Sequence, residues 1–232
     1  AGILLLVGGS IGHGALDLVL RKIGAAGDGD VLLPAGAQIL CRHLDHAIHI
    51  DVKGDLDLGL GGEAGADAGH LLRLDIPTGH TVIEVDAGGQ NRILVWGGAN
   101  RELTHSYLEK IFSYGEEGDI VLLQNETNLT ETIIRRAHGL GFRVVFNPSP
   151  FPAHPELLSL EDVDVFIVNE AEATQLTGAP EGTAPATLLE HLHTKFPSAD
   201  LVVTAGELGS IALLSGTQYA QEAFPVTVID TT

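Results

Sequence analysis

The stretch "DIVLLQNETNLTETIIRRAHGLGFRVVFN", residues 119–147, contains the unit that decides the fold class. Residues 119–124 are almost continuously apolar, which is typical of a strand buried on both faces of a parallel sheet. Residues 129–141 carry apolar side chains at helical spacing, and residues 142–147 form a second apolar run. A strand, a helix and another strand in this order predict a parallel βαβ unit.

The alternation extends in both directions along the chain. Upstream, two alternating runs flank the turn "AGGQ" and predict a hairpin, and a helix follows with Thr104 as its N-cap and Gly115 as its stop. Downstream, two more strands alternate with helices, and two final runs suggest an antiparallel pair. The expected ranges are 81–86 and 92–96 (hairpin), 103–115, 170–178 and 186–196 (helices), 163–169 and 200–206 (strands), and 210–216 and 223–230 (closing pair). We therefore predict a layered α/β fold with a mostly parallel sheet.

Composition limits the partners. The 232 residues suffice for one large domain, or one domain with a small appendage. A net charge of −19 argues against a nucleic-acid or anionic-membrane partner, since both require a basic surface. The single Cys41 excludes an internal disulfide and fits a reducing compartment. Because no apolar run reaches the length of a membrane span, we expect a cytoplasmic protein.

The first third of the chain differs from the rest in amino-acid composition and periodicity. Residues 1–95 contain no Phe, Tyr or Trp, and the Gly-rich residues 54–70 show neither helical nor strand periodicity. We expect residues 1–72 to be an atypical Gly-, Ala-, Leu- and Asp-rich segment, distinct from residues 73–232. Two motifs in it invite other interpretations. The glycines at positions 8, 9, 12 and 14 follow an apolar run, as in a dinucleotide-binding site, but they do not fit its G-x-G-x-x-G motif. The histidines at 43, 46 and 49 lie near Cys41, and helical spacing could gather two of them around a metal, although steps of three drift around a helix.

Polar and glycine residues follow four successive strands. Ligands of parallel sheets bind outside the carboxyl ends of the strands, so these positions are candidate site residues. Glu126 and Glu172 could orient hydroxyl groups or help to organise a magnesium ion, while "TAGELG" (204–209) offers backbone N–H groups to a phosphate. Helix capping is the structural alternative for an Asn or Glu at such a position. The candidates are Asn125, Glu126, Asn147, Asn169, Glu170, Glu172, Thr204, Gly206 and Gly209.

Five motifs in residues 73–232 resemble the ribokinase (PfkB-type) family of sugar kinases. They follow one another in the family's order: a lid hairpin with a following Gly-Ala-Asn, a strand whose Glu contacts the sugar, an Asn-Pro segment, an Asn-x-x-Glu signature and a nucleotide-phosphate turn. In this chain they are "PTGHTVIEVDAGGQNRILVWGGANRELT" (77–104), "VLLQNET" (121–127), "FNPSP" (146–150), "VNEAEATQLTG" (168–178) and "VTAGELG" (203–209).

The resemblance implies a ribokinase-like fold, with a small β lid at about residues 80–96, and transfer of phosphate from ATP to a pentose, with D-ribose giving ribose 5-phosphate. It implies that the substrates are a small-molecule sugar and ATP, that Mg²⁺ is required, and that the hairpin can mediate a homodimer. The implied site residues are Glu126 and Asn100 for the sugar, Asn169 and Glu172 for the metal, and Asn147, Asn169, Thr204, Gly206 and Gly209 for the nucleotide.

The two ends of the chain depart from the family pattern. The resemblance places a Gly-Ala-Gly-Asp motif, which ends in the catalytic Asp, directly after Thr232. No catalytic residue is therefore assigned in this chain, and Asp230 and Thr232 are assigned to a monovalent cation such as K⁺. Residues 1–72 lack the family's Gly-Gly-Lys-Gly motif. A mis-assigned gene start or a shifted reading frame would explain its absence. We therefore expect an incomplete chain with little or no activity. A non-catalytic sugar- or nucleotide-binding relative and a dinucleotide-binding enzyme are the alternatives.

Overall fold

A computed structural model describes residues 3–6, 74–77, 79–85 and 91–224. Its main sheet has seven strands in the order β1-β4-β5-β6-β7-β8-β9. The first five are parallel neighbours, and the last two are added in antiparallel orientation. The strands are β1 (Ile3–Leu6), β4 (Ile120–Gln124), β5 (Arg143–Asn147), β6 (Val165–Asn169), β7 (Asp200–Thr204), β8 (Ser210–Leu214) and β9 (Thr217–Gln221). The predicted α/β class and the mostly parallel sheet are confirmed.

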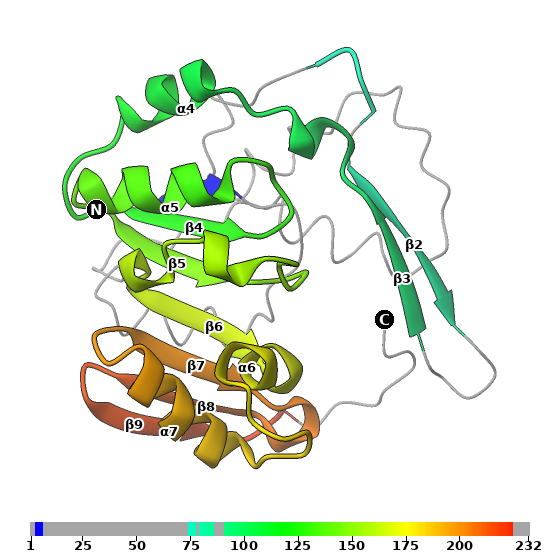
Figure 1. The fold of residues 1–232 in the computed structure, drawn as a ribbon, viewed down its shortest axis with the longest axis vertical. Coiled ribbons are helices and arrows are strands. Elements are labelled where there is room, and N and C mark those ends of the chain that lie inside the picture. The colour runs from blue at the N-terminus through cyan, green and yellow to red at the C-terminus, as the bar shows by residue number, and fades with distance from the viewer. Residues whose placement is uncertain (1–2, 7–73, 78, 86–90, 225–232) are drawn as a thin grey trace.

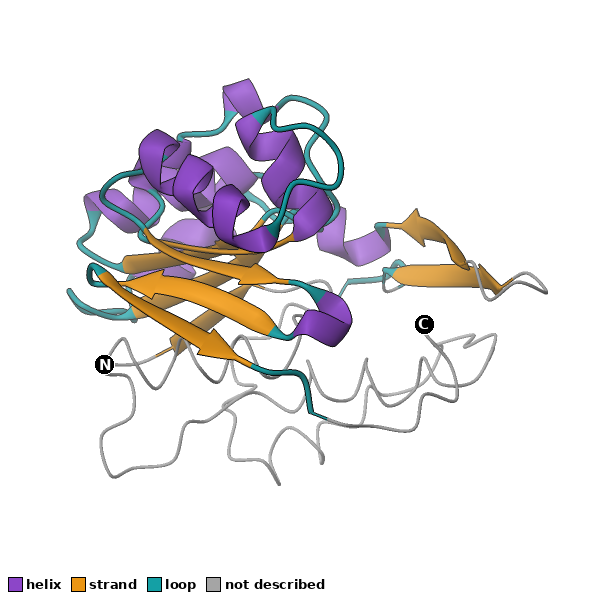
Figure 2. Ribbon diagram, turned by 90° about the horizontal axis from the view of Figure 1, so that it is seen from below, coloured by secondary structure: helices purple, strands orange, loops and turns teal. Residues whose placement is uncertain are grey.

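Four α-helices, α4 (His105–Phe112), α5 (Thr130–Gly139), α6 (Glu170–Thr177) and α7 (Pro185–Lys195), lie over one face of the sheet (Figure 2). Thr104 caps α4 as predicted, since its hydroxyl accepts from the backbone N–H of Tyr107 at 3.2 Å. That helix ends at Phe112, three residues before the predicted Gly115. Four short 3₁₀ turns complete the described elements, namely η1 (Gly98–Arg101), η2 (Pro155–Leu157), η3 (Leu160–Asp162) and η4 (Gly206–Leu208).

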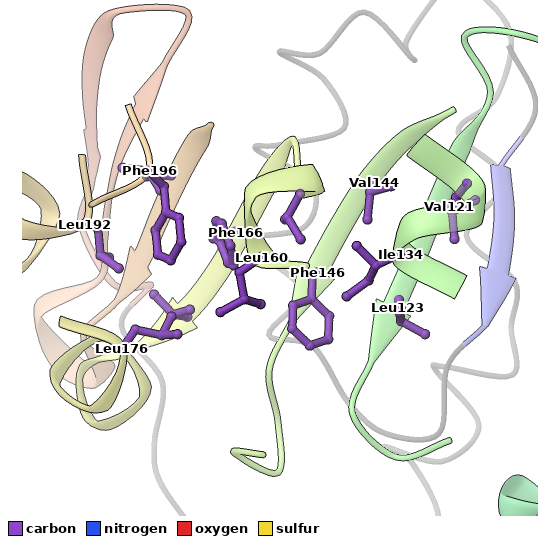
Figure 3. Packing of buried hydrophobic residues seen from close by; sticks show 14 of the residues in the cluster. Val121, Leu123, Ile134, Val144, Phe146, Leu160, Phe166, Leu176, Leu192 and Phe196 are labelled. Atoms are coloured by element: carbon purple, nitrogen blue, oxygen red, sulfur yellow. The ribbon is translucent and has the colours of Figure 1, made fainter. Parts of the chain in front are cut away.

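The core lies between the helices and the sheet (Figure 3). Side chains alternate along a strand, so every second residue of β4 to β7 faces the helices. Phe146 and Phe166 are fully buried there, and the Phe166 ring lies 4.5 Å from the ring of Phe196. These aromatic residues all belong to the half of the chain that the sequence predicts to be well ordered.

The strands β2 (His80–Val85) and β3 (Asn91–Trp96) form a separate antiparallel hairpin, as predicted. It extends away from the main sheet (Figure 1). Its base is closed by backbone contacts, because the N–H of Ala99 donates to Pro77 O at 3.0 Å. A Cβ on Gly98, whose φ is +46°, would lie 2.5 Å from Pro77 O, so this position requires glycine.

The predicted closing pair is partly wrong. β8 does pair antiparallel, but its outer partner is β9, a strand that the sequence interpretation omitted. The turn Ser215–Gly216 joins them with positive φ at both residues (50° and 76°), as tight hairpins favour. β9 lies at the sheet edge with four of five residues exposed, so it has no apolar signature.

Several predictions concern residues outside the described ranges. They are the atypical segment 1–72 apart from β1, the glycines at positions 8 to 14, the histidines near Cys41, most of residues 223–230, and the cation residues Asp230 and Thr232. Within the described residues, no helix is both long and apolar enough to cross a membrane.

Candidate active site at the carboxyl ends of the strands

Four polar residues end four adjacent parallel strands. Gln124, Asn147, Asn169 and Thr204 are the last residues of β4, β5, β6 and β7. Gln124 lies opposite Asn147 in the sheet register, and Asn169 lies opposite Thr204. The alternation of side chains places Gln124, Asn147 and Thr204 on the face opposite the helices, whereas the Asn169 side chain turns to the start of α6. The structure therefore brings three of the predicted nucleotide-binding residues to one edge of the sheet and adds Gln124.

Buried amides connect the first three of these strands. Gln124 is 1% exposed, and its Nε2 donates to Asn147 Oδ1 at 3.0 Å. Asn147, 8% exposed, in turn donates through Nδ2 to the carbonyl of Ile167 at 2.6 Å. Gln124 Oε1 is buried and has no hydrogen-bond partner among the described residues. Sequence reasoning missed Gln124, since an amide at the end of an apolar run gives no distinctive signal.

Glu126 follows β4 by two residues and is half-buried. Burial raises the pKa of its carboxyl to about 7, and the nearby positive charge of Arg101 opposes that rise. The neighbouring Thr127 is buried, and its hydroxyl has no hydrogen-bond partner among the described residues. A carboxylate with little solvation of its own is well suited to accept hydrogen bonds from ligand hydroxyl groups.

Asn100 lies in η1, at the base of the hairpin. Its carbonyl accepts from the N–H of Asn128 at 3.4 Å, which places it beside the loop that carries Glu126. A Cβ built on Gly79 would lie 2.6 Å from Asn100 Nδ2, so the start of β2 closely approaches this side chain. The structure therefore brings the two predicted sugar residues to adjoining segments.

Asn169 and Glu172 form a capping box at the start of α6. Asn169 Oδ1 accepts from the Glu172 N–H at 2.8 Å, and Glu172 Oε2 accepts from the Asn169 N–H at 3.0 Å. Glu172 is only 5% exposed, and this burial raises the pKa of its carboxyl, while hydrogen bonds from Asn169 and Ser149 oppose the rise. Helix capping, the structural alternative for these two positions, is therefore observed, since both residues cap the start of α6.

The donor set allows a hydrated magnesium ion. No three His, Cys, Asp or Glu side chains within the described ranges gather closely enough to hold a metal by themselves. Mg²⁺ usually keeps several waters and needs only one or two protein carboxylates. Glu172, with its oxygens engaged by Asn169 and Ser149, suits contact with such an ion through water.

Gly206 begins η4, and Thr204 and Gly209 lie on either side of it. The Thr204 hydroxyl donates to Val168 O at 3.4 Å. Gly206 has a φ of +51°, and a Cβ at this position would meet open space, whereas a Cβ on Gly209 would overlap Gln221 O. Gly209 is therefore required by the close approach of the chain at the end of β9. The N–H groups of Leu208 and Gly209 donate within the turn itself.

Comparison with known proteins fits this arrangement. A family model described as pfkB family carbohydrate kinase matches residues 67–232, well over half of the chain. The chain belongs to this family. A ribokinase of Staphylococcus aureus is 31% identical over 174 residues, covering 72% of this chain and 56% of that protein.

Solved structures agree with the pfkB assignment. Ribokinase from Thermotoga maritima superimposes with a TM-score of 0.58 at 26% identity, covering 77% of this chain and 58% of that one. Ribokinase from Arabidopsis thaliana, complexed with ribose and ATP, gives a TM-score of 0.55 at 27% identity, covering 75% and 59%. The chain thus spans a little over half the length of these relatives. The ribokinase-like fold is confirmed.

A second family model, NAD-specific glutamate dehydrogenase, matches residues 1–98, less than half of the chain. It overlaps the pfkB match over residues 67–98. Within that overlap the structure forms the β2–β3 hairpin, which the kinase motif predicts.

Proposed function

We propose that the protein is a pentose kinase that transfers the terminal phosphate of ATP to the primary hydroxyl of a sugar, with D-ribose as the preferred sugar. The observation that carries this proposal is the half-buried Glu126 beside a row of polar residues at the ends of four parallel strands. A half-buried carboxylate suits the binding of sugar hydroxyl groups, and the polar sheet edge beside it suits the binding of phosphates. Family membership supplies the reaction class.

The residues of this chain would divide the work. Glu126 and Asn100 would hold the sugar from two adjoining segments. Gly206 would offer a backbone N–H to a nucleotide phosphate from the start of η4, since the N–H groups of Leu208 and Gly209 are already bonded. A bound magnesium ion supplies charge neutralisation for the phosphates in such transfers.

Three further assignments belong to the same proposal. Asn147, Asn169 and Thr204 line the nucleotide side, and Asn169 and Glu172 organise the waters of the metal. Asp230 and Thr232 hold a monovalent cation such as K⁺.

The proposal is tested by binding. Turnover also needs a general base, for which the family resemblance names an Asp, so binding is the sharper test of this chain. Isothermal titration of this chain with ribose, 2-deoxyribose, ATP and NAD should give binding of ribose and of ATP with Mg²⁺. Glu126→Gln should weaken ribose binding and leave ATP binding intact. Binding of NAD alone would instead support the dinucleotide alternative, and binding without turnover by a chain that includes the Asp would support the non-catalytic one.

We also propose that the hairpin mediates a homodimer. Val82 and Leu94 lie opposite each other on one face of the hairpin, 53% and 47% exposed, and Trp96 on the same face is 47% exposed. Apolar side chains gathered on a small exposed sheet are typical of an interface. Sedimentation equilibrium should give a dimer that Leu94→Lys dissociates; a monomer at all concentrations would contradict this.

A further inference from the structure

The loop that carries Glu126, residues 125–129, is fastened at both ends. At its start, the Asn125 N–H donates to Ser149 O at 3.1 Å, and Asn125 Nδ2 donates to Pro150 O at 2.8 Å. Ser149 also hydrogen-bonds Glu172 through its side chain. This end of the loop is therefore tied to the segment that contacts the predicted metal residue.

At its other end the loop is tied to the base of the hairpin. Asn128 Oδ1 accepts from the Leu103 N–H at 3.0 Å, and Asn128 Nδ2 donates to Leu103 O at 2.8 Å. The Asn128 side-chain amide thus pairs with both backbone groups of Leu103, as the peptide group of a neighbouring strand would. Next to it, Arg101 Nη1 donates to Thr127 O at 2.9 Å. Arg101 is the last residue of η1, so these bonds join the hairpin base to the residues that follow Glu126.

The local conformation breaks an ordinary sequence rule at this point. An Asn just before a helix commonly caps it, but the N-cap of α5 is Leu129, which makes no side-chain capping bond. Leu129 also has a φ of +61°, a left-handed conformation that is unfavourable for leucine. Asn128 gives its amide to Leu103 instead of to the helix. Departures from local preference of this kind concentrate at functional sites.

We propose that Asn128 is a positioning residue that couples the β2–β3 hairpin to Glu126. This inference rests on the proposed function of Glu126 as the sugar-binding carboxylate. With Asn125 held on one side and Asn128 on the other, the position of Glu126 follows that of the hairpin base. A movement of the hairpin over the site would change the contact of Glu126 with the sugar, and sugar binding would in turn favour one hairpin position.

The test uses Trp96, the only tryptophan in the chain, which ends β3 next to the hairpin base. Its fluorescence is titrated with ribose and, separately, with Mg²⁺ and ATP. In Asn128→Ala we expect the dissociation constant for ribose to rise about tenfold, as for two lost hydrogen bonds, and that for ATP to change less than about twofold. Gln218→Ala, which removes an exposed amide from β9, is the control and should behave as the wild type.

The same proteins are compared by hydrogen exchange without ligand. Asn128→Ala should raise exchange in residues 91–96 and 125–129 together, and Gln218→Ala in neither. Unchanged exchange in residues 91–96 would overturn the coupling, whether or not the wild type binds ribose. A wild type that binds no ribose would contradict the proposed function, which is a separate result. Equal losses of ribose and ATP affinity would also overturn it. If Asn128→Ala does not fold, Asn128→Asp keeps the acceptor for the Leu103 N–H, and the same two outcomes apply to it.

Discussion

Glu126→Gln should make folding stability less sensitive to pH. In the folded protein burial raises the pKa of Glu126 from 4.5 to about 7. Between these values the unfolded chain releases its proton while the folded chain keeps it, so wild-type stability falls as the pH rises. Below pH 4.5 this loss is absent, and above about 7 it is complete.

The size of the effect follows from the shift in pKa. At 1.36 kcal/mol per pH unit, a rise from 4.5 to about 7 corresponds to about 3 kcal/mol for a carboxyl removed from water. Because Glu126 is only half-buried, we expect about half of this, about 1.5–2 kcal/mol. The neutral, isosteric Gln does not titrate, so the stability difference between variant and wild type should grow by this amount between about pH 4 and pH 8.

Urea unfolding of both proteins across this range measures the difference directly. Glu181→Gln, which removes an exposed carboxylate from a loop, is the control for the loss of one negative charge. A difference between Glu126→Gln and the wild type that stays constant from acid to mildly alkaline pH would refute the raised pKa, and with it the view that burial removes water from Glu126.

Three other changes should have distinct effects. Gly209→Ala should destabilise the fold by about 3 kcal/mol or more in urea, because its Cβ would overlap Gln221 O, whereas Gly182→Ala, at a similar φ but in open space, should cost about 1 kcal/mol. Asn169→Ala should cost about 1 kcal/mol through loss of the capping box, seen as a lower urea midpoint. Phe166→Ala should cost about 3–5 kcal/mol, also by urea unfolding, and a loss below about 1 kcal/mol would show that the cluster around it is poorly packed.

Much of the fold could be predicted from local patterns. The strands β4 to β7 are short apolar runs because both of their faces are buried, and the Thr104 and Asn169 caps follow from the preference of such residues for helix starts. β9 could not be predicted in this way. It is an exposed edge strand, and it is held by a two-residue turn rather than by burial of its own side chains.

The site was only partly predictable for a related reason. The family motifs select Glu126 and Asn100 as candidates for the sugar site, but no motif selects Arg101 or Asn128 beside them. They act through carbonyl and amide groups of residues about 25 positions away, and such contacts leave no periodicity in the sequence. Gln124 is similar, since its importance comes only from its register with Asn147.

The amide chain across the sheet also limits what Asn147 can do. One Nδ2 hydrogen donates to Ile167 O and one Oδ1 lone pair accepts from Gln124, which leaves one donor and one acceptor position for a nucleotide or its water. Both bonds must be kept if the ends of β4, β5 and β6 are to stay aligned. Replacing Asn147 by an apolar residue would therefore disturb three strand ends at once, and any resulting loss of ATP binding would reflect the sheet edge as well as a missing contact. Asn147 is better regarded as the group that holds the edge in shape, whereas the side chains of Asn169 on β6 and Thr204 on β7 each bond one backbone group among the described residues and keep more positions for the proposed nucleotide.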